Sequence, residues 1–600
     1  MAPIRTFRTY TQALPRLIVL QMITKPVLAA ILALLNVVAD WALAAQGRVA
    51  VTTGDFAFLF TTPHGLILMA LGVVTLYLYV AFDLTMYVSF SNHWLRGDDV
   101  SIRQTMLEGL SAIRRFLTPS GALVVLYVAL IAPIVGSAAP ISLTKNFYIP
   151  TFITSVITST PLYNLAYRAF CVFFFVLGIV CAFCVQGMVL DGLTAWQACR
   201  RSARLVREHW LDFLLRFLSF SACMFVLSLL VTAVVLTGGA SLGFEIGQYV
   251  ETELGLIDET LLMRTIIIFG YILTKALIAL IASLGEPLTI MRVTELYLGY
   301  QAGEPVELPV RRRRLHLALW LGTLLILSAS ALVSLVLANS FDEFFPARSY
   351  VQVIAHRICG SEGIENSVSG IDTAVAAGAW GAETDIQRTL DGAYVINHDA
   401  TFQRVAGVDA KPSEMNVADI RKLTINDERF PSAHEPVPTY EEMLDACNDR
   451  ILLFVELKGE TADRQMADDA VRIARERGMF DQCVFISLDY ELIDYLETTY
   501  PNALTGFLEF ASYGDTASLN CDFLALEEES ATADAIDAIH AQGKNALVWT
   551  VNDEDSQRRF LCSDADAIIT DNVTQAIGLR EGLEERSDME RVADRFSYLF

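Results

Sequence analysis

Residues 381–386 (GAETDI) and 451–458 (ILLFVELK) decide the fold of the carboxyl-terminal half of this 600-residue chain. Each is a short run typical of a buried strand, and each carries charged residues toward its end. Six similar runs complete a set of eight: 351–357, 483–488, 503–510, 522–529, 545–552 and 566–571. Helical patterns fall between most of them, at 368–378, 439–447, 462–478, 489–499, 533–542 and 553–561. This alternation predicts a (β/α)8 TIM barrel, with an open doubly wound α/β sheet as the alternative.

One segment interrupts the alternation. Residues 393–438 contain the short strand pattern YVINHD and continue as polar loop instead of a plain helix. An insertion after the second strand of a barrel emerges at the carboxyl ends of the strands, where barrels carry their chemistry. We therefore expect 393–438 to lie over the catalytic face.

The amino-terminal half has a different composition. Hydrophobic residues make up 54% of the whole chain and charged residues only 19%, compared with roughly 45–50% and 25% in soluble domains. From residue 345 onward there are 48 acidic and 21 basic residues, so the charge of the chain is concentrated there. A strongly acidic domain argues against a nucleic-acid partner, because phosphate backbones require clustered basic residues.

Seven apolar stretches in this half are long enough to cross about 30 Å of hydrocarbon. They lie near 17–39, 64–90, 121–140, 169–190, 214–238, 265–285 and 315–338. Basic residues cluster before the first span and after the second, fourth and sixth, in the groups Arg5 to Arg16, Arg96 to Arg115, Arg200 to Arg207, and Arg292 with Arg311 to Arg314. Because basic loops stay cytoplasmic, we expect a multi-pass protein of the cell membrane with a cytoplasmic amino terminus and an extracytoplasmic barrel.

Two ionisable residues stand out within these spans. Asp83 is in the second span and Lys275 is in the sixth. Charged groups inside a bilayer are costly, so they usually find a partner or line a polar cavity. We expect either a pair between these two residues or a position near the interface, with a transport pathway as the less favoured alternative.

The strand ends of the barrel half gather residues suited to metal-assisted chemistry. Glu383 and Asp385 are two apart, so a strand directs both side chains to one face. Glu456 adds a third carboxylate from the next strand, and three carboxylates favour Mg²⁺ or Ca²⁺ over zinc. His356 and His398 bracket the first two acids in the chain, which places an acid/base pair beside a divalent metal.

These residues belong to a longer ordered set that resembles the glycerophosphodiester phosphodiesterase family. The set comprises His356-Arg357, Glu365-Asn366, Glu383-Thr384-Asp385, Thr389-Leu390-Asp391-Gly392, His398-Asp399, Glu456-Leu457-Lys458, Trp549-Thr550-Val551-Asn552 and Ile569-Thr570-Asp571. The resemblance covers about 350–580, and its motifs are specific. The preceding half resembles the multi-span membrane domain fused to some bacterial members.

The resemblance implies cleavage of glycerophosphodiesters to glycerol 3-phosphate and an alcohol. It implies a divalent ion held by Glu383, Asp385, Glu456 and Glu365, which would bind a phosphoryl oxygen and a glycerol hydroxyl. His356 and His398 would share the acid and base roles, while Arg357 and Lys458 would offset phosphoryl charge. Trp549 would form a wall for the glycerol backbone, and Asp399 would fix the His398 loop by hydrogen bonds. A cyclic phosphate intermediate and direct hydrolysis both remain open.

Two positions depart from the family pattern. The usual Gly after His-Arg is Ile358 here, and the usual Pro before Glu-Asn is Ile364. The spacing of the motifs is kept. We therefore expect a reshaped first loop with an intact site.

The domain organisation expected from these patterns is as follows: a membrane domain at 1–339 with about seven transmembrane helices, a linker at 340–348, the barrel at 349–582 and an acidic carboxyl-terminal tail at 583–600. Two alternative functions remain open. One is a lysophospholipase D-like enzyme acting on membrane lysophospholipids, which the nearby bilayer would supply. The other is a lipid-binding or transport module with the barrel as a sensor. The sequence indicates no particular oligomeric state.

Overall fold

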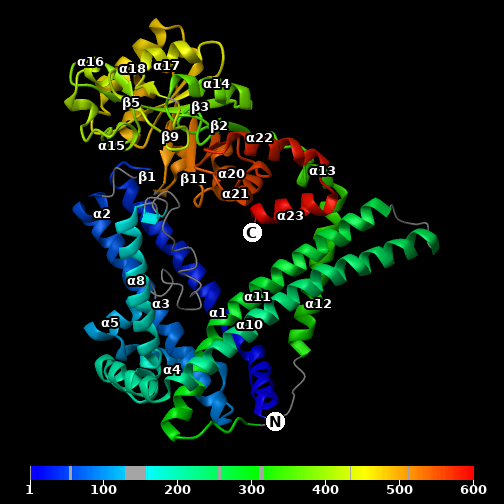
Figure 1. Cartoon of the computed structure of the whole chain (residues 1–600). Coiled ribbons are helices and arrows are strands. Elements are labelled where there is room, and N and C mark those ends of the chain that lie inside the picture. Colours follow the sequence, from blue (N-terminus) through cyan, green and yellow to red (C-terminus); the bar gives the residue numbers. More distant parts are fainter. Residues whose placement is uncertain are drawn as a thin grey trace. The chain divides into compact units, whose positions relative to one another are not determined.

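The computed structural model describes residues 2–52, 57–128, 154, 157–158, 160–253, 259–309, 317–432, 434–510 and 512–599 (Figure 1). These residues form two compact units. Unit 1 is Met1–Val38 with Leu66–Asn339, and unit 2 is Ala39–Gly65 with Ser340–Phe600. Each unit has its own buried core.

Unit 1 is helical. Its principal helices are α1 (Ala2–Ala44), α3 (Pro63–Arg96), α4 (Ile102–Ala112), α5 (Pro119–Leu126), α8 (Pro161–Val180), α9 (Cys184–Leu190), α10 (Ala195–Glu253), α11 (Glu259–Ala302) and α12 (Leu317–Asn339). Six of the helices in the described part of the chain are long and apolar enough to cross a bilayer. The remaining predicted span, 121–140, begins in α5, and its residues from 129 lie outside the described part. The predicted multi-span helical membrane domain is confirmed.

Helices α1, α3 and α11 share a core in unit 1. Leu17 and Leu20 of α1, Tyr87 of α3, and Leu284 and Leu288 of α11 belong to one buried cluster. These residues recur at the three- and four-residue spacing that places them along one face of each helix. Asp83 of α3 lies within this bundle and is fully buried, although it is ionisable.

Unit 2 is built around a closed barrel of eight parallel strands (Figure 1). Its strands are β2 (Gln352–Ala355), β3 (Gly381–Arg388), β7 (Leu452–Leu457), β8 (Cys483–Ser487), β9 (Leu504–Glu509), β11 (Phe523–Glu527), β12 (Asn545–Trp549) and β13 (Ala567–Thr570). The barrel closes because β2 pairs with both β3 and β13. The TIM barrel is therefore confirmed, and the open sheet is excluded.

The predicted barrel helices are also present, as α14 (Val368–Ala377), α17 (Tyr440–Cys447), α18 (Arg464–Glu476), α19 (Tyr490–Thr499), α20 (Ala533–Ala541) and α21 (Glu554–Leu561), followed by α22 (Val573–Gly582). Several begin at a capping side chain, such as Asp463 for α18 and Asp553 for α21, which accepts hydrogen bonds from backbone N–H groups of the first turn. The apolar faces of these helices pack on the outside of the strands in one large core.

Residues 393–438 form the predicted insertion. They comprise β4 (Tyr394–Ile396), antiparallel to β3, then α15 (Gln403–Ala406), α16 (Val417–Ile420), β5 (Thr424–Ile425) and β6 (Glu435–Pro436). A small core of their own, including Val395, Phe402 and Ile420, holds them against Ile364 of the loop after β2.

Most of the acidic segment after the barrel is helical. Helix α23 (Asp588–Leu599) buries Val592 and Phe596, because apolar residues recur at helical spacing between its charged ones. Arg591 donates to the backbone oxygen of Phe345 and to Asp342, which ties this helix to the residues just before the barrel.

A short strand from the amino-terminal half also belongs to unit 2. Strand β1 (Ala50–Val51) pairs antiparallel with β10 (Tyr513–Gly514), which lies in the connection between β9 and β11. The backbone N–H of Asp515 extends the pair by donating to Val49 at 3.1 Å. Gly514 has a φ of +106°, and a Cβ there would collide with the backbone of Val49. The segment after the first predicted span is thus packed on a barrel loop.

Candidate active site

Three carboxylates meet at the carboxyl ends of β3 and β7. Parallel pairing sets Asp385 beside Glu456, and Glu383 lies two residues earlier on the same face of β3. All three side chains are buried, and one oxygen atom from each lies within 4.8 Å of the others. The carboxylate group inferred from the sequence is therefore present in the fold.

Lys458 is the cation that faces this group. Its Nζ donates to Oδ1 of Asp385 at 3.0 Å and to Oε2 of Glu456 at 2.9 Å. Burial alone would lower the pKa of Lys458, but the two carboxylates raise it above its ordinary value. With every group ionised, three acids and one lysine carry a net charge of −2.

The acids respond differently to this crowding. Burial raises the pKa of Glu383 well above its ordinary value, and the charge of Asp385 raises it further. Burial also raises the pKa of Glu456 to about 7, against the opposing effect of Lys458. For Asp385, burial is outweighed by the charges of Lys458 and His398, so its pKa is depressed.

The donor set fits a divalent cation. Oε1 of Glu383 is buried and has no hydrogen-bond partner in the described structure, while its other oxygen accepts the backbone N–H of Arg357 at 2.8 Å. A buried carboxylate oxygen without a donor is costly, and a hard cation removes that cost. The net charge of −2 matches the same ligand.

His356 reaches this group from the end of β2. Its Nδ1 donates to Oδ1 of Asp571 at 2.7 Å, and its Nε2 lies 3.9 Å from Oε2 of Glu383. Asn552 donates to the other oxygen of Asp571 at 2.6 Å. These hydrogen bonds depress the pKa of Asp571 to about 2, although burial acts in the opposite direction. Asp571 therefore fixes the ring so that Nε2 points toward the carboxylates.

The loop after β2 turns sharply beside His356. Arg357 and Ile358 both have positive φ angles, of 48° and 76°. A β-branched residue is strained in this region whereas glycine is not, which gives a physical reason for the glycine that the family usually has at the position of Ile358. Gly360 also has a positive φ, and a Cβ on it would overlap the backbone of Asp571.

His398 lies on the loop that follows β4. Its Nδ1 donates to Asp399 at 2.9 Å. This hydrogen bond is the one expected if Asp399 fixes the His398 loop. Gln387 of β3 donates to the backbone oxygens of Asn397 and Asp399, which holds the loop against the barrel. Burial lowers the pKa of His398 below its ordinary value, against the raising effect of Asp385. The imidazole therefore favours its neutral form.

Glu365 stands apart from the three clustered acids. Its carboxylate accepts two hydrogen bonds from Arg404, at 2.6 and 2.8 Å, and Nη1 of Arg357 lies 3.5 Å away. The neighbouring Asn366 instead reaches the cluster, because its amide donates to Asp385 at 2.9 Å. The structure thus brings together Glu383, Asp385 and Glu456 but leaves Glu365 paired with two arginines.

Arg404 was missed by sequence reasoning. It extends from α15 of the insertion and also donates to Asp399 at 2.7 Å, so it joins Glu365 to the loop that carries His398. Its position confirms that the insertion lies over this face. The only signal in the sequence was the break in the strand and helix alternation.

Trp549 ends β12 and is partly buried in the interior of the barrel. Its indole Nε1 donates to the backbone oxygen of Ala525 in β11 at 2.9 Å. The ring is therefore fixed by the neighbouring strand, and its position at a strand end is the one predicted.

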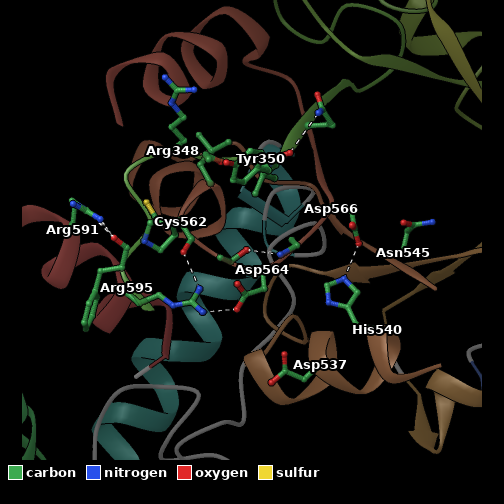
Figure 2. Close-up of a pocket in the computed structure, with 18 of the residues that line it drawn as sticks. Arg348, Tyr350, Asp537, His540, Asn545, Cys562, Asp564, Asp566, Arg591 and Arg595 are labelled. Carbon is green, nitrogen blue, oxygen red and sulfur yellow. Dashed lines mark hydrogen bonds and ion pairs between the residues drawn. The ribbon is translucent and has the colours of Figure 1, made fainter. Parts of the chain in front are cut away.

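A cavity of about 650 Å³ lies elsewhere in unit 2 (Figure 2). Its lining includes residues at the amino ends of strands, such as Gln352, Phe523 and Asn545. Two of its arginines, Arg591 and Arg595, are already paired with acids. The clustered carboxylates do not line this cavity, so the reactive groups are at the other end of the barrel.

Two family models match the chain. Residues 4–326 match the membrane domain of glycerophosphoryl diester phosphodiesterase, and residues 356–575 match the glycerophosphoryl diester phosphodiesterase family. The first match alone spans more than half of the chain, and the second contains all nine residues proposed for the site from the sequence.

Individual relatives resemble the barrel half. A glycerophosphodiester phosphodiesterase of Caldanaerobacter subterraneus is 24% identical over 241 residues, which cover 38% of this chain and 96% of that protein. Human glycerophosphodiester phosphodiesterase 1 is 33% identical over 120 residues, 19% of this chain and 35% of that protein. A solved phosphodiesterase of Oleispira antarctica, in complex with the product sn-glycerol-3-phosphate, is 21% identical with a TM-score of 0.36, over 40% of this chain and 98% of that one.

Proposed function

The chain belongs to the glycerophosphoryl diester phosphodiesterase family and is a phosphoric diester hydrolase with a membrane domain. From this premise, we propose that it is a membrane-anchored, metal-dependent enzyme. Its substrates are glycerophosphodiesters, and its products are glycerol 3-phosphate and an alcohol. In the overall reaction, water adds across one P–O bond: its hydroxyl ends on phosphorus and its proton on the leaving alcohol.

The metal ligands in this proposal are Glu383, Asp385 and Glu456, with Mg²⁺ or Ca²⁺ as the ion. Their clustering, the unpartnered oxygen of Glu383 and the net charge of −2 support it. When bound, the ion supplies Lewis-acid chemistry that polarises a phosphoryl oxygen and lowers the pKa of a hydroxyl group. Glu365 serves as a fourth ligand only if it exchanges Arg404 for the ion.

The two histidines carry the proton transfers. Nε2 of His356 is the atom free to act, because Nδ1 is held by Asp571. His398 is held in the same way by Asp399, and its lowered pKa favours the neutral ring that accepts a proton. A general acid and a general base on separate loops are what cleavage of a diester needs, because one oxygen must lose a proton and another must gain one.

Three further residues bind the substrate. Arg357 and Lys458 offset the charge of the phosphoryl group as it develops, and Lys458 is already held at the carboxylates. Trp549 presents its ring at the end of β12 as a wall for the glycerol backbone.

The observation that carries the proposal is the buried group of three carboxylates with Lys458 and His356 at one end of the barrel. The test is turnover by the full-length protein in lipid nanodiscs, with glycerophosphocholine, glycerophosphoglycerol and lysophosphatidylcholine compared. We expect glycerol 3-phosphate from the first two only when Mg²⁺ or Ca²⁺ is present. Equal turnover after chelation would overturn the metal requirement, and no turnover of any diester would overturn the activity.

The proposed topology has a cytoplasmic amino terminus, seven spans and an extracytoplasmic barrel. The pairing of β1 with β10 supports it, because Ala50 follows the last residue of α1 by only six positions. The end of the first span and the barrel must then be on the same side of the membrane, so the spans between them are even in number. Five described apolar helices follow α1, and the span predicted from the sequence at 121–140 would bring the number to six, as parity requires.

The same pairing favours lysophospholipids as a second candidate substrate class. Strand β10 follows β9, whose carboxyl end lies at the reactive end of the barrel. Its partner β1 lies in the short connection between α1 and α3, two helices that qualify as membrane spans. A barrel loop joined to this connection would be within reach of lipid headgroups. In the turnover comparison, choline loss from lysophosphatidylcholine would identify this activity.

A further inference from the structure

The buried Asp83 of unit 1 is not paired with Lys275, the partner considered from the sequence. Its Oδ2 lies 3.8 Å from Nζ of Lys25 on α1, and that ammonium also donates to the Tyr79 hydroxyl at 3.0 Å. A second buried acid, Glu286 of α11, is close enough to Asp83 for the two carboxyl groups to interact. Asp83 thus lies between one cation and another acid.

The charges of these three residues do not balance. Lys25 supplies one positive charge, whereas Asp83 and Glu286 supply two negative charges if both are ionised. The exposed fractions of Asp83 and Glu286 are 0% and 7%, and the three helices that carry Lys25, Asp83 and Glu286 share a buried apolar core. An uncompensated charge in such apolar surroundings is expensive. One further positive charge is needed, and a proton or a monovalent ion supplies it.

Unpartnered polar atoms point to the same place. Both carboxylate oxygens of Asp83, Oε1 of Glu286 and the hydroxyl of Tyr87 are buried without a hydrogen-bond partner in the described structure. Tyr87 is 0% exposed and lies one helical turn after Asp83 on α3. The hydroxyl of Thr24, next to Lys25 in the chain, is also buried and unpartnered. Hard oxygen atoms left without donors are suited to a small cation.

Two of the helices that carry these residues contain a proline at this point. Pro26 follows Lys25 within α1, and Pro287 follows Glu286 within α11. Proline has no N–H group, so the carbonyl four residues earlier loses its helical partner. In α11 that carbonyl belongs to Ser283, and the Gln21 side chain of α1 donates to it. In transmembrane helices, such interruptions are tolerated where neighbouring side chains replace the lost bonds.

We propose that Lys25, Asp83 and Glu286 form a site for one exchangeable monovalent cation, a proton or a sodium ion, inside the membrane domain. In the proton form, Glu286 donates its proton to Asp83, which faces Lys25. In the sodium form, that proton leaves to solution and the ion takes its place among the carboxylate and hydroxyl oxygens. The groups that face the site are Lys25 from α1, Tyr79 and Tyr87 from α3, and Glu286 from α11.

The test measures the thermal unfolding midpoint of the full-length protein in lipid nanodiscs between pH 5 and pH 9. Wild type is compared with Glu286→Gln, which keeps the size and hydrogen-bond donation of the protonated acid. In choline chloride, the midpoint of wild type relative to the glutamine variant should fall as pH rises, because loss of the proton leaves a buried negative charge. Adding NaCl at high pH should restore it if sodium binds, and should not if only a proton binds.

A matched control is Glu208→Gln, which removes an exposed glutamate of α10. The unfolding midpoint of this control should change with pH in the same way as that of wild type. Asp83→Asn provides a second variant that should also lose the response if Glu286→Gln fails to fold. Wild-type and Glu286→Gln midpoints that stay parallel across pH, with no effect of sodium, would overturn the proposal.

Discussion

His356 and Asp571 are 215 residues apart in the chain, yet Nδ1 of the histidine lies 2.7 Å from Oδ1 of the aspartate. The first strand and the last strand of the barrel bring them together, because β2 and β13 are neighbours in the closed sheet. The orientation of His356, in the first motif of the barrel, is therefore set by a residue at the other end of the domain.

Asp571→Ala should lower kcat by roughly 10²-fold or more with little change in KM, because the histidine loses the partner that fixes its orientation. The measurement is steady-state turnover of glycerophosphocholine. A matched control is Asp566→Asn, because Asp566 also contacts a histidine, His540, at 2.9 Å. If both variants lost the same activity, the role of Asp571 would be structural.

Glu383→Gln should abolish divalent-ion binding and turnover, because only two clustered carboxylates remain. Glu365→Gln should keep binding measurable, since Glu365 is held by Arg404 and lies outside the group of three. Calorimetric titration of each variant with Mg²⁺ and Ca²⁺ separates the two residues. Loss of binding in Glu365→Gln alone would reverse the assignment.

Asp399→Asn should move the acidic limb of the pH–rate profile to lower pH. The hydrogen bond to Asp399 raises the pKa of His398, whereas burial lowers it below the ordinary value. Removing the negative charge of Asp399 therefore lowers the pKa of His398 further, and the histidine remains a neutral base to lower pH. A rise in the pH of this limb, or no acidic limb in wild type, would exclude His398 as the base. His398→Ala should lose about 10²- to 10⁴-fold in rate.

Gly360→Ala should inactivate the enzyme and destabilise the barrel by more than about 1 kcal/mol. The new methyl group would overlap the backbone of Asp571, and the positive φ is unfavourable for alanine. Denaturant unfolding and turnover provide the measurements. Gly378→Ala is the control, because Gly378 also has a positive φ, of +84°, but no atom lies within 4 Å of a Cβ placed on it. It should share the cost in stability but not the loss of activity.

Single cysteines at Asp515 and Arg312, in a cysteine-free background, should distinguish the two sides of the membrane in intact cells. Asp515 is exposed beside β10 and should react with an impermeant thiol reagent. Arg312 lies in the basic run after the sixth predicted span and should react only after permeabilisation. The opposite pattern would place the barrel, and its substrates, in the cytoplasm.

Local patterns in the sequence predicted much of this molecule. All eight barrel strands and the six helices between them follow from the alternation of apolar runs and amphipathic segments, because hydrophobic periodicity is a local property. The spacing of Glu383 and Asp385 also predicted their common face, since a strand repeats every two residues.

Partnerships between side chains were decided by the tertiary structure. Lys458 contacts Asp385 because the strand register sets β7 beside β3. Arg404 pairs with Glu365 because the insertion folds back over the strand ends. Asp83 meets Lys25 and Glu286, and not Lys275, because helix packing selects which faces touch. The sequence determines which charged groups are present and their order in the chain. The distances between them depend on the strand register and helix packing of segments far apart in the sequence. Those distances determine which carboxylates can share a cation.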